Sequence, residues 1–417
     1  MIALHVMVTA LGVALGVFYP FISVILADRG FTPAEIGLVF SLGAVGFTIA
    51  VPTWGHLADV RLGRARTLQL CAIGAGAAVA GLLLPAPPLV IVALLIVFWL
   101  FESSWQPLAD AVTVNALRGR DYARVRLFTS FGFAVSAIAS GFLFDAVGYW
   151  PAPLLFALAS LAMAASALFL PDVERADLAA HRRRVAQSAA PPREGAREPA
   201  QAAPVVRRLN LGSAGVALRV APRLVAVLLA AILLHVGIIS GFTFLPLRIE
   251  ALGGSPADVA LSAGLSATAE IPAMLVMGAV ARRLGLRTVF VVSALIYAAC
   301  IASWTVIEIP LVIVGTRMIT GLAFSGVIVG IVMTIAEILP RDLQGTGQSL
   351  YQTSAFGIGA VVANVLGGVL YGSFGHEALF GVGAVLAVAS AVIGWFAFPG
   401  APGRGPGTRE VSGVAAR

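Results

Sequence analysis

A small set of ionisable side chains lies within or beside the long apolar stretches of this sequence, and these are the residues best suited to chemistry. A charge at the centre of an apolar membrane helix costs about 2.5 to 3.5 kcal/mol on insertion scales, so each is a candidate functional residue. An acid there favours its protonated form and can bind and release a proton, whereas an arginine can bind a carboxylate through two hydrogen bonds. The set is His5, Glu102, Asp110, Arg126, His235, Glu270 and Arg317.

The first group of polar residues falls between positions 102 and 126. Glu102, Trp105, Gln106 and Asp110 are spaced i, i+3, i+4 and i+8, which places them on or near one face of a helix and predicts that this face meets a cavity or a partner. A short turn separates Asp110 from Arg126, so two antiparallel helices can bring them together. The pair then either binds a solute or joins the two helices as a structural ion pair.

The second group is centred on Glu270, which has no charged neighbour in the sequence. We expect it to carry a proton, the alternative being permanent neutralisation by Arg317. His235 either relays that proton or hydrogen-bonds a neighbouring helix. Arg317 either tunes an acid, Glu270 or Glu102, or binds an anionic solute. His5 lies close enough to the N-terminus to be a helix-end residue without a role.

A third group lies near position 350. Gln348, Tyr351 and Gln352 share one helix face at i, i+3 and i+4. Together with Trp105 they offer hydrogen bonds and a flat apolar surface, which suits a small aromatic or sugar-like solute. Packing against the helix that contains Glu270 is the alternative.

Composition identifies the elements that must position these residues. Hydrophobic residues make up 59% of the 417 residues and charged residues only 11%, against roughly 25% in a typical soluble domain. Apolar runs of about 20 residues recur and each can cross a bilayer. Twelve such spans are expected at 2–26, 35–58, 67–84, 88–113, 124–144, 151–170, 222–246, 257–281, 287–306, 310–336, 346–371 and 376–398. The sequence therefore predicts an all-α membrane protein in which prolines and glycines allow helices to bend.

The spans fall into two sets of six, which predicts two six-helix bundles at 1–170 and 222–398. The segment 171–221, rich in Arg, Ala, Pro and Glu, is expected to be a flexible linker, and 399–417 a disordered tail. Arginines gather in alternate loops, and positive residues in short loops stay in the cytoplasm, so both termini are expected there. These arginines are Arg61, Arg64, Arg66, Arg118, Arg120, Arg124, Arg282, Arg283, Arg287 and Arg341, against Arg29 and Arg248 on the other side.

Several functions are disfavoured by what the sequence contains. The basic residues are spread between apolar spans, which argues against nucleic-acid binding. No phosphate-binding loop, no metal-ligand spacing and no nucleophile–base pair stands out, so we expect neither an enzyme nor a cofactor. All 27 basic residues are arginine, which is typical of a GC-rich bacterial genome. We expect a monomer in the bacterial cytoplasmic (inner) membrane, with lipid, protons and a small molecule as its partners.

One loop resembles the signature of a known family, and its pattern recurs in the second half of the chain. The loop with Gly55, Asp59, Arg61, Gly63 and Arg64 resembles the signature between helices 2 and 3 of the major facilitator superfamily, with one extra residue before Gly63. That insertion leaves open which arginine pairs with Asp59. A similar pattern of glycine, charges and glycine, at 278–287, follows the eighth span.

Other residues are similar to one branch of that superfamily, the lactose permease-like, nucleoside and phenylpropionate proton symporters. They are Pro107 to Ala111, Asp121 to Phe128, Gly132, His235, Ala269, Glu270, Gln348 and Tyr351. The resemblance implies two pseudo-symmetric bundles around a central site, solute binding at Asp110 and Arg126, and proton symport by alternating access. Export by proton antiport is the main alternative, although helix 5 lacks the Gly-Pro signature of such antiporters. A membrane scaffold or sensor that does not transport is a second alternative.

Overall fold

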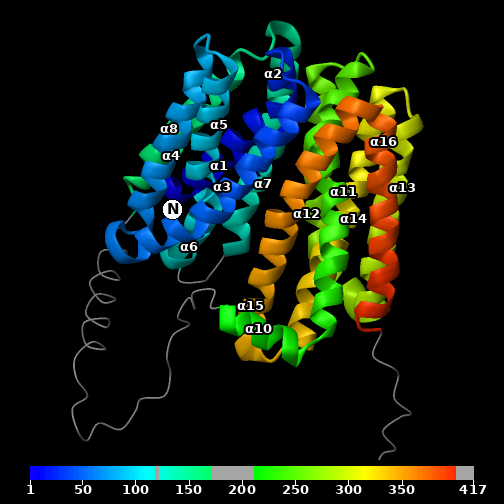
Figure 1. The fold of residues 1–417 in the computed structure, drawn as a ribbon. Helices are drawn as coiled ribbons and strands as arrows, with labels where there is room; N and C mark the ends of the chain where they lie inside the picture. Colours follow the sequence, from blue (N-terminus) through cyan, green and yellow to red (C-terminus); the bar gives the residue numbers. More distant parts are fainter. Residues whose placement is uncertain (118–121, 171–210, 401–417) are drawn as a thin grey trace, which may run out of the picture.

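The computed structural model describes residues 1–117, 122–170 and 211–400. In these ranges the chain forms helices and no strands, and the helices lie in two bundles side by side (Figure 1). Ten of the helices are long and apolar enough to cross a membrane, and one of these, Arg341–Ala397, bends sharply at Gly375 into two. A further apolar helix covers Pro151–Ala167. The predicted all-α membrane fold with twelve spans is therefore confirmed.

The first bundle contains six membrane-crossing units, two of which are interrupted helices. Its elements are α1 Ile2–Phe18, η1 Tyr19–Phe21, α2 Ile22–Asp28, α3 Pro33–Leu57, η2 Ala58–Leu62, α4 Arg64–Ala80, η3 Gly81–Leu83, α5 Pro88–Glu102, α6 Trp105–Leu117, α7 Tyr122–Val147 and α8 Pro151–Ala167.

The second bundle repeats this organisation. Its elements are α11 Arg223–Ala251, α12 Pro256–Leu284, α13 Leu286–Val306, α14 Pro310–Ile338, α15 Arg341–Gln352, η4 Thr353–Ile358 and α16 Gly359–Ala397. The helix α10 Leu211–Val220 precedes it.

The two halves share the way in which equivalent helices begin. Both α3 and α12 start with a capping box, Thr32 with Glu35 and Ser255 with Asp258, followed in each case by a proline at the first helical position. The side chain of each cap residue accepts a hydrogen bond from the backbone N–H three residues later, and the acid reaches back to the cap. The same local device therefore fixes the start of the second helix in each bundle.

The turns are repeated as well. Six glycines in the described ranges have positive φ angles between 79° and 86°, a conformation that other residues adopt only with strain. Each has its equivalent in the other half, with the pairs Gly30 and Gly253, Gly63 and Gly285, and Gly148 and Gly375. Gly63 and Gly285 also agree in ψ, at 155° and 151°. The backbone thus carries the predicted pseudo-symmetry even where the side chains differ.

Proline accounts for the two interrupted helices of the first bundle. Pro20 has no N–H to donate to the carbonyl of Gly16, and the first span becomes a 3₁₀ turn at Tyr19–Phe21. Pro107 likewise cannot bond to the carbonyl of Ser103, and the fourth span divides into α5 and α6 at residues 103 and 104. The expected single helix over 88–113 is therefore two helices. Glu102 ends the first, and Trp105, Gln106 and Asp110 lie on the second.

The bundles meet mainly through two helix pairs, α3 with α16 and α7 with α12. We call the end of the molecule with Arg29 the Arg29 end and the opposite one, with Asp59, the Asp59 end. Gly37 lies so close to the carbonyl oxygen of Asn364 that no side chain fits between them, and Gly141 lies equally close to Ala260. Each of these four residues lies in the part of its helix nearer the Arg29 end. The bundles are therefore tightly packed there.

The helix α10 falls within the range expected to be a flexible linker. It packs against α15 and α11, and Ala217 is fully buried. The small apolar side chains of 214–220 supply a packing face. The remainder of the expected linker, 171–210, and most of the expected tail, 401–417, lie outside the described residues.

Candidate functional site

Asp110 is the centre of a polar cluster in the first bundle. Its Oδ1 accepts a hydrogen bond from Gln106 Nε2 at 2.8 Å, and Arg126 Nε lies 3.4 Å from the same oxygen. Gln106 and Asp110 are one helical turn apart on α6, and Arg126 is near the start of α7. About a third of each charged side chain is exposed, 32% for Asp110 and 38% for Arg126. The structure thus joins three predicted residues and leaves their polar groups accessible.

Glu270 lies on the other side of the boundary between bundles, facing this cluster. The helices α7 and α12 run antiparallel, with Gly264 packed against Ala134. Counted eight residues from this contact towards the Asp59 end, α7 reaches Arg126 and α12 reaches residue 272. Arg126 and Glu270 are therefore at nearly the same level. Their charges interact across the boundary. Arg126 therefore interacts with two acids, Asp110 of its own bundle and Glu270 of the other.

Within the second bundle the polar chain continues from Glu270 to Arg317. The phenol of Tyr297 on α13 interacts electrostatically with both side chains. Arg317 Nη1 donates to Thr320 Oγ1 at 3.1 Å, and its guanidinium lies 6.0 Å from the ring centre of Trp304. Among the described residues we find no ion pair of Arg317 with Glu270 or Glu102. Tyr297 therefore interacts electrostatically with both charged residues, which form no salt bridge with each other in the described part of the chain.

Glu102 lies apart from that chain, inside the first bundle. Its side chain is 8% exposed, and its Oε2 accepts a hydrogen bond of 2.8 Å from Tyr19 Oη. Trp105 is fully buried and stacks on Phe156 with ring centres 5.5 Å apart. The break between α5 and α6 separates the two residues, so the predicted common stripe is divided. Trp105 occupies a packing position, whereas Glu102 contacts a residue at the break in the first span.

His235 is a buried residue with both ring nitrogens in contact with polar groups. Nδ1 lies 2.8 Å from the backbone oxygen of Ala231, and Nε2 lies 3.2 Å from Tyr351 Oη. Phe356 packs edge-on against the imidazole. These contacts join α11 to α15 and η4 and fit the structural alternative for His235. They also place Tyr351 in the interior of the second bundle.

The neighbours of Tyr351 on α15 have different surroundings. Gln348 Nε2 donates to the carbonyl of Val332 on α14 at 3.0 Å, whereas Gln352 is exposed. On the predicted face, Gln348 and Tyr351 therefore contact neighbouring helices, and the amide of Gln352 is accessible. His5 bonds the oxygen of Met1 through Nδ1, as expected of a helix-end residue.

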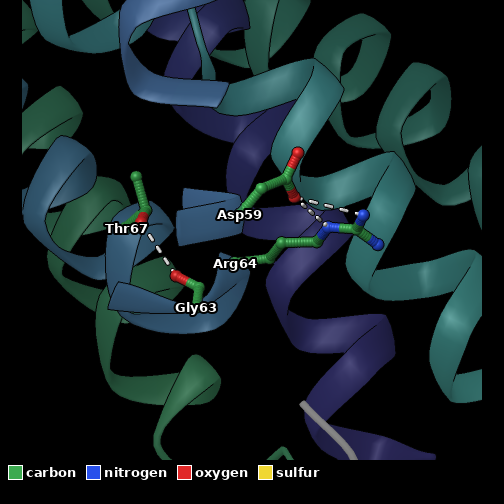
Figure 2. A network of polar contacts seen from close by, with 4 residues as sticks. All are labelled: Asp59, Gly63, Arg64 and Thr67. Atoms are coloured by element: carbon green, nitrogen blue, oxygen red, sulfur yellow. Dashed lines mark hydrogen bonds and ion pairs between the residues drawn. The ribbon is translucent and has the colours of Figure 1, made fainter. Parts of the chain in front are cut away.

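The loop at the Asp59 end is stabilised by an ion pair and a special backbone conformation. Arg64 donates from Nε and Nη2 to Asp59 Oδ1, each at 3.3 Å, which identifies the partner of Asp59 (Figure 2). Beside this pair, the carbonyl of Gly63 accepts a hydrogen bond of 2.8 Å from Thr67 Oγ1 (Figure 2). Arg61 is exposed, and Gly55 has no atoms crowding the position of a side chain. The extra residue before Gly63 is absorbed by the π-helical turn η2.

Sequence reasoning missed three tyrosines. Tyr19 contacts Glu102, Tyr297 interacts electrostatically with Glu270 and Arg317, and Tyr149 donates a hydrogen bond to Glu250 between the bundles at the Arg29 end. Burial raises the pKa of Tyr149, and the neighbouring Glu250 raises it further. A polar ring within or beside an apolar span was the available signal, but tyrosine is common at such positions.

Known proteins resemble this chain along most of its length. The sequence profile described as "MFS_1 like family" matches residues 11–382. A maltose permease of Geobacillus stearothermophilus is 26% identical over 366 residues, which is 86% of this chain and 84% of the permease. Sugar efflux transporter A of Escherichia coli K12 is 30% identical over 151 residues, 34% of this chain and 36% of that protein.

Solved structures agree on the fold. The nucleoside transporter NupG, as its D323A mutant, superposes with a TM-score of 0.77 at 15% identity, covering 95% of this chain and 98% of that one. A D-xylose-proton symporter gives 0.68 at 13% identity, with 96% and 97% covered. With the profile match over most of the chain, they establish that this chain belongs to the MFS_1 like family and is a multi-pass transporter of the major facilitator superfamily, not an enzyme.

Proposed function

We propose that this transporter moves a small sugar-like solute across the bacterial cytoplasmic membrane by alternating access, in symport with a proton. The relatives named for maltose, nucleosides and xylose support a hydroxyl-rich solute. Gln106, Asp110 and Gln352 offer the amides and the carboxylate that bind such hydroxyl groups. Aromatic acids, nucleosides and sugars remain the solutes to be screened.

The observation that carries this proposal is the position of Arg126 and Glu270 at nearly the same level of α7 and α12, two helices that pack against each other across the boundary between bundles. A nearby cation favours the carboxylate form of an acid. If the bundles move against each other, the distance between these two residues changes, and so does the tendency of Glu270 to hold a proton. The conformation then affects proton binding to Glu270, and proton binding affects the conformation equally.

Asp110 offers a connection from that proton to the solute. It shares Arg126 with Glu270, so a solute that binds Asp110 alters how strongly the arginine interacts with the second acid. The alternative is a structural ion pair that only joins α6 to α7. Asp110→Asn separates the two, because a binding role predicts weaker solute affinity and a structural role predicts lower thermal stability with normal affinity.

The arrangement of contacts also supports an inward-open conformation. The arginine-rich loops favour a cytoplasmic position for the Asp59 end. The close glycine contacts lie towards the Arg29 end, which would then be the closed, external side. Both termini are cytoplasmic in this proposal, and the bundles at residues 1–170 and 222–398 are its moving parts.

Proteoliposomes with an imposed pH gradient test the proposal. Radiolabelled maltose, xylose, nucleosides and aromatic acids are screened first for accumulation. Glu270→Gln is expected to abolish accumulation of the accepted solute and to retain counterflow exchange, since exchange needs no net proton movement. Glu337→Gln, on the exposed face of α14, is the matched control. Unchanged accumulation by Glu270→Gln would remove this residue from proton coupling.

Export is the second candidate, because 151 residues are 30% identical to a sugar efflux transporter. The same acids would serve antiport, in which an entering proton drives the solute outwards. Vesicles of opposite orientation distinguish the two directions. Symport predicts accumulation on the side to which protons flow, and antiport predicts accumulation on the side from which they come.

A further inference from the structure

The buried pair of Glu102 and Tyr19 is not used by the function proposed above. Glu102 is the last residue of α5, and Tyr19 is the first residue of the 3₁₀ turn that interrupts the first span. Their oxygens are 2.8 Å apart, with the tyrosine as donor. Glu102 is 8% exposed, and Tyr19 is half-buried. An acid and its single hydroxyl partner are thus enclosed in the interior of the first bundle.

In the described part of the chain, no charged side chain interacts with Glu102. Tyr19 is the only titratable group in the described part of the chain that interacts with it. The helices packed against α5 are α3 and α4, and none of their titratable residues interacts with this acid. Those residues are Glu35, His56, Arg64, Arg66 and Cys71. A buried carboxylate with one neutral donor is costly, whereas the neutral acid is not.

The position of Tyr19 connects this acid to the boundary between bundles. The turn η1, which begins at Tyr19, contacts α11 and α12 of the second bundle, so Tyr19 lies close to the boundary between the bundles. Phe98, with ring centres 5.9 Å apart, supports the phenol from the α5 side. Its hydroxyl carries one hydrogen, which it can donate to only one partner. While Glu102 is a carboxylate, that hydrogen is engaged.

We propose that Glu102 is a second proton-binding site, and that the proton reverses its hydrogen bond with Tyr19. A proton from water adds to Glu102 Oε2, and the new O–H donates to Tyr19 Oη. The tyrosine hydrogen is then released from Glu102 and can be donated to another acceptor near the boundary between the bundles. One proton on an interior acid thereby supplies a hydrogen-bond donor at the boundary. The inference deepens the proposed function, because it adds a proton to the transport cycle.

Infrared difference spectroscopy of the full chain in liposomes tests this without a solute. The C=O stretch of protonated buried acids is followed as the pH is changed. Two pH-dependent bands are expected, one lost in Glu270→Gln and the other in Glu102→Gln. Tyr19→Phe is expected to shift the Glu102 band, since it removes the acceptor of the new O–H. Tyr371→Phe, at a ring stacked on Phe244, is the control and should leave both bands in place.

Two results would overturn the inference. One is a pH difference spectrum that Glu102→Gln leaves unchanged. The other, which also covers a Glu102 variant that fails to fold, is a Tyr19→Phe protein with every band at its original frequency. Neither result depends on transport, so the second proton site and the role of Glu270 fail or survive separately.

Discussion

Gly37→Ala tests whether the packing at the Arg29 end sets the balance between conformations. The new Cβ would lie 2.1 Å from the backbone oxygen of Asn364, where ordinary contact begins at 3.4 Å. The two helices must therefore separate by about 1.3 Å at this point, the difference between these two distances. Overpacking of this kind costs about 1–3 kcal/mol. Because the cost falls only on the conformation closed at this end, the equilibrium is expected to shift about 5- to 150-fold towards opening there.

Spin labels on the two bundles measure that shift. Leu84 and Ile309, both exposed and both beside turns at the Arg29 end, accept labels in a background without Cys71 and Cys300. Pulsed electron-spin distance measurements should show a population at longer separation in Gly37→Ala. Distances between labels on the two bundles at the Asp59 end should become shorter.

Two other glycines serve as controls. At Gly315 a Cβ meets no atom within 4 Å, so Gly315→Ala should leave the distances unchanged. At Gly12 a Cβ would lie 2.1 Å from the oxygen of Thr129, but both residues belong to the first bundle. Gly12→Ala should therefore lower the melting temperature without moving the distance distribution. The reasoning is refuted if folded Gly37→Ala keeps the original distances, or if Gly315→Ala shifts them equally.

Three further predictions concern single contacts. Asp59→Asn should remove the ion pair with Arg64 and slow solute exchange in proteoliposomes, whereas Arg66→Ala should exchange at the normal rate. Equal exchange rates in both variants and the unmodified protein would show that the ion pair has no part in transport. His235→Gln should lower the melting temperature by a few degrees and retain accumulation driven by a pH gradient, because its two ring contacts are structural; lost accumulation in a stable protein would restore the proton relay. Gly285→Ala should cost about 1–3 kcal/mol through its positive φ angle, a loss that thermal unfolding measures and that an unchanged melting temperature would contradict.

The fold was accessible from the sequence because hydrocarbon imposes a simple rule on the backbone. Apolar runs of about 20 residues have few alternatives to a spanning helix, and the positions of arginine loops divide them into repeats. The rule fails at two places. Pro107 lacks an N–H and so interrupts the helix four residues earlier, and residues 211–220 form a packed helix although they are only modestly apolar. The hydrophobicity of neighbouring residues predicts neither the interrupted helix nor the packed one.

The candidate site was predictable as a list of residues but not as a set of partners. The pairing of Asp110 with Arg126 followed from their positions on either side of a short turn. The interaction of Arg126 with Glu270 depends on the register of two helices from different bundles, which no local pattern encodes. Tyr19 and Tyr297 were missed for the same reason, since their importance lies in which acid each one faces.

The glycine contacts between the bundles have a kinetic consequence. Where Gly37 meets the carbonyl of Asn364, and where Gly141 meets the carbonyl of Pro256 and the methyl group of Ala260, the contacts are made by backbone and one small side chain. Such surfaces can slide apart without a sequence of rotamer changes. The activation barrier for switching between conformations should then depend on the few hydrogen bonds between the bundles, such as that of Tyr149 with Glu250. A single hydroxyl group would then influence turnover more than a whole helix face.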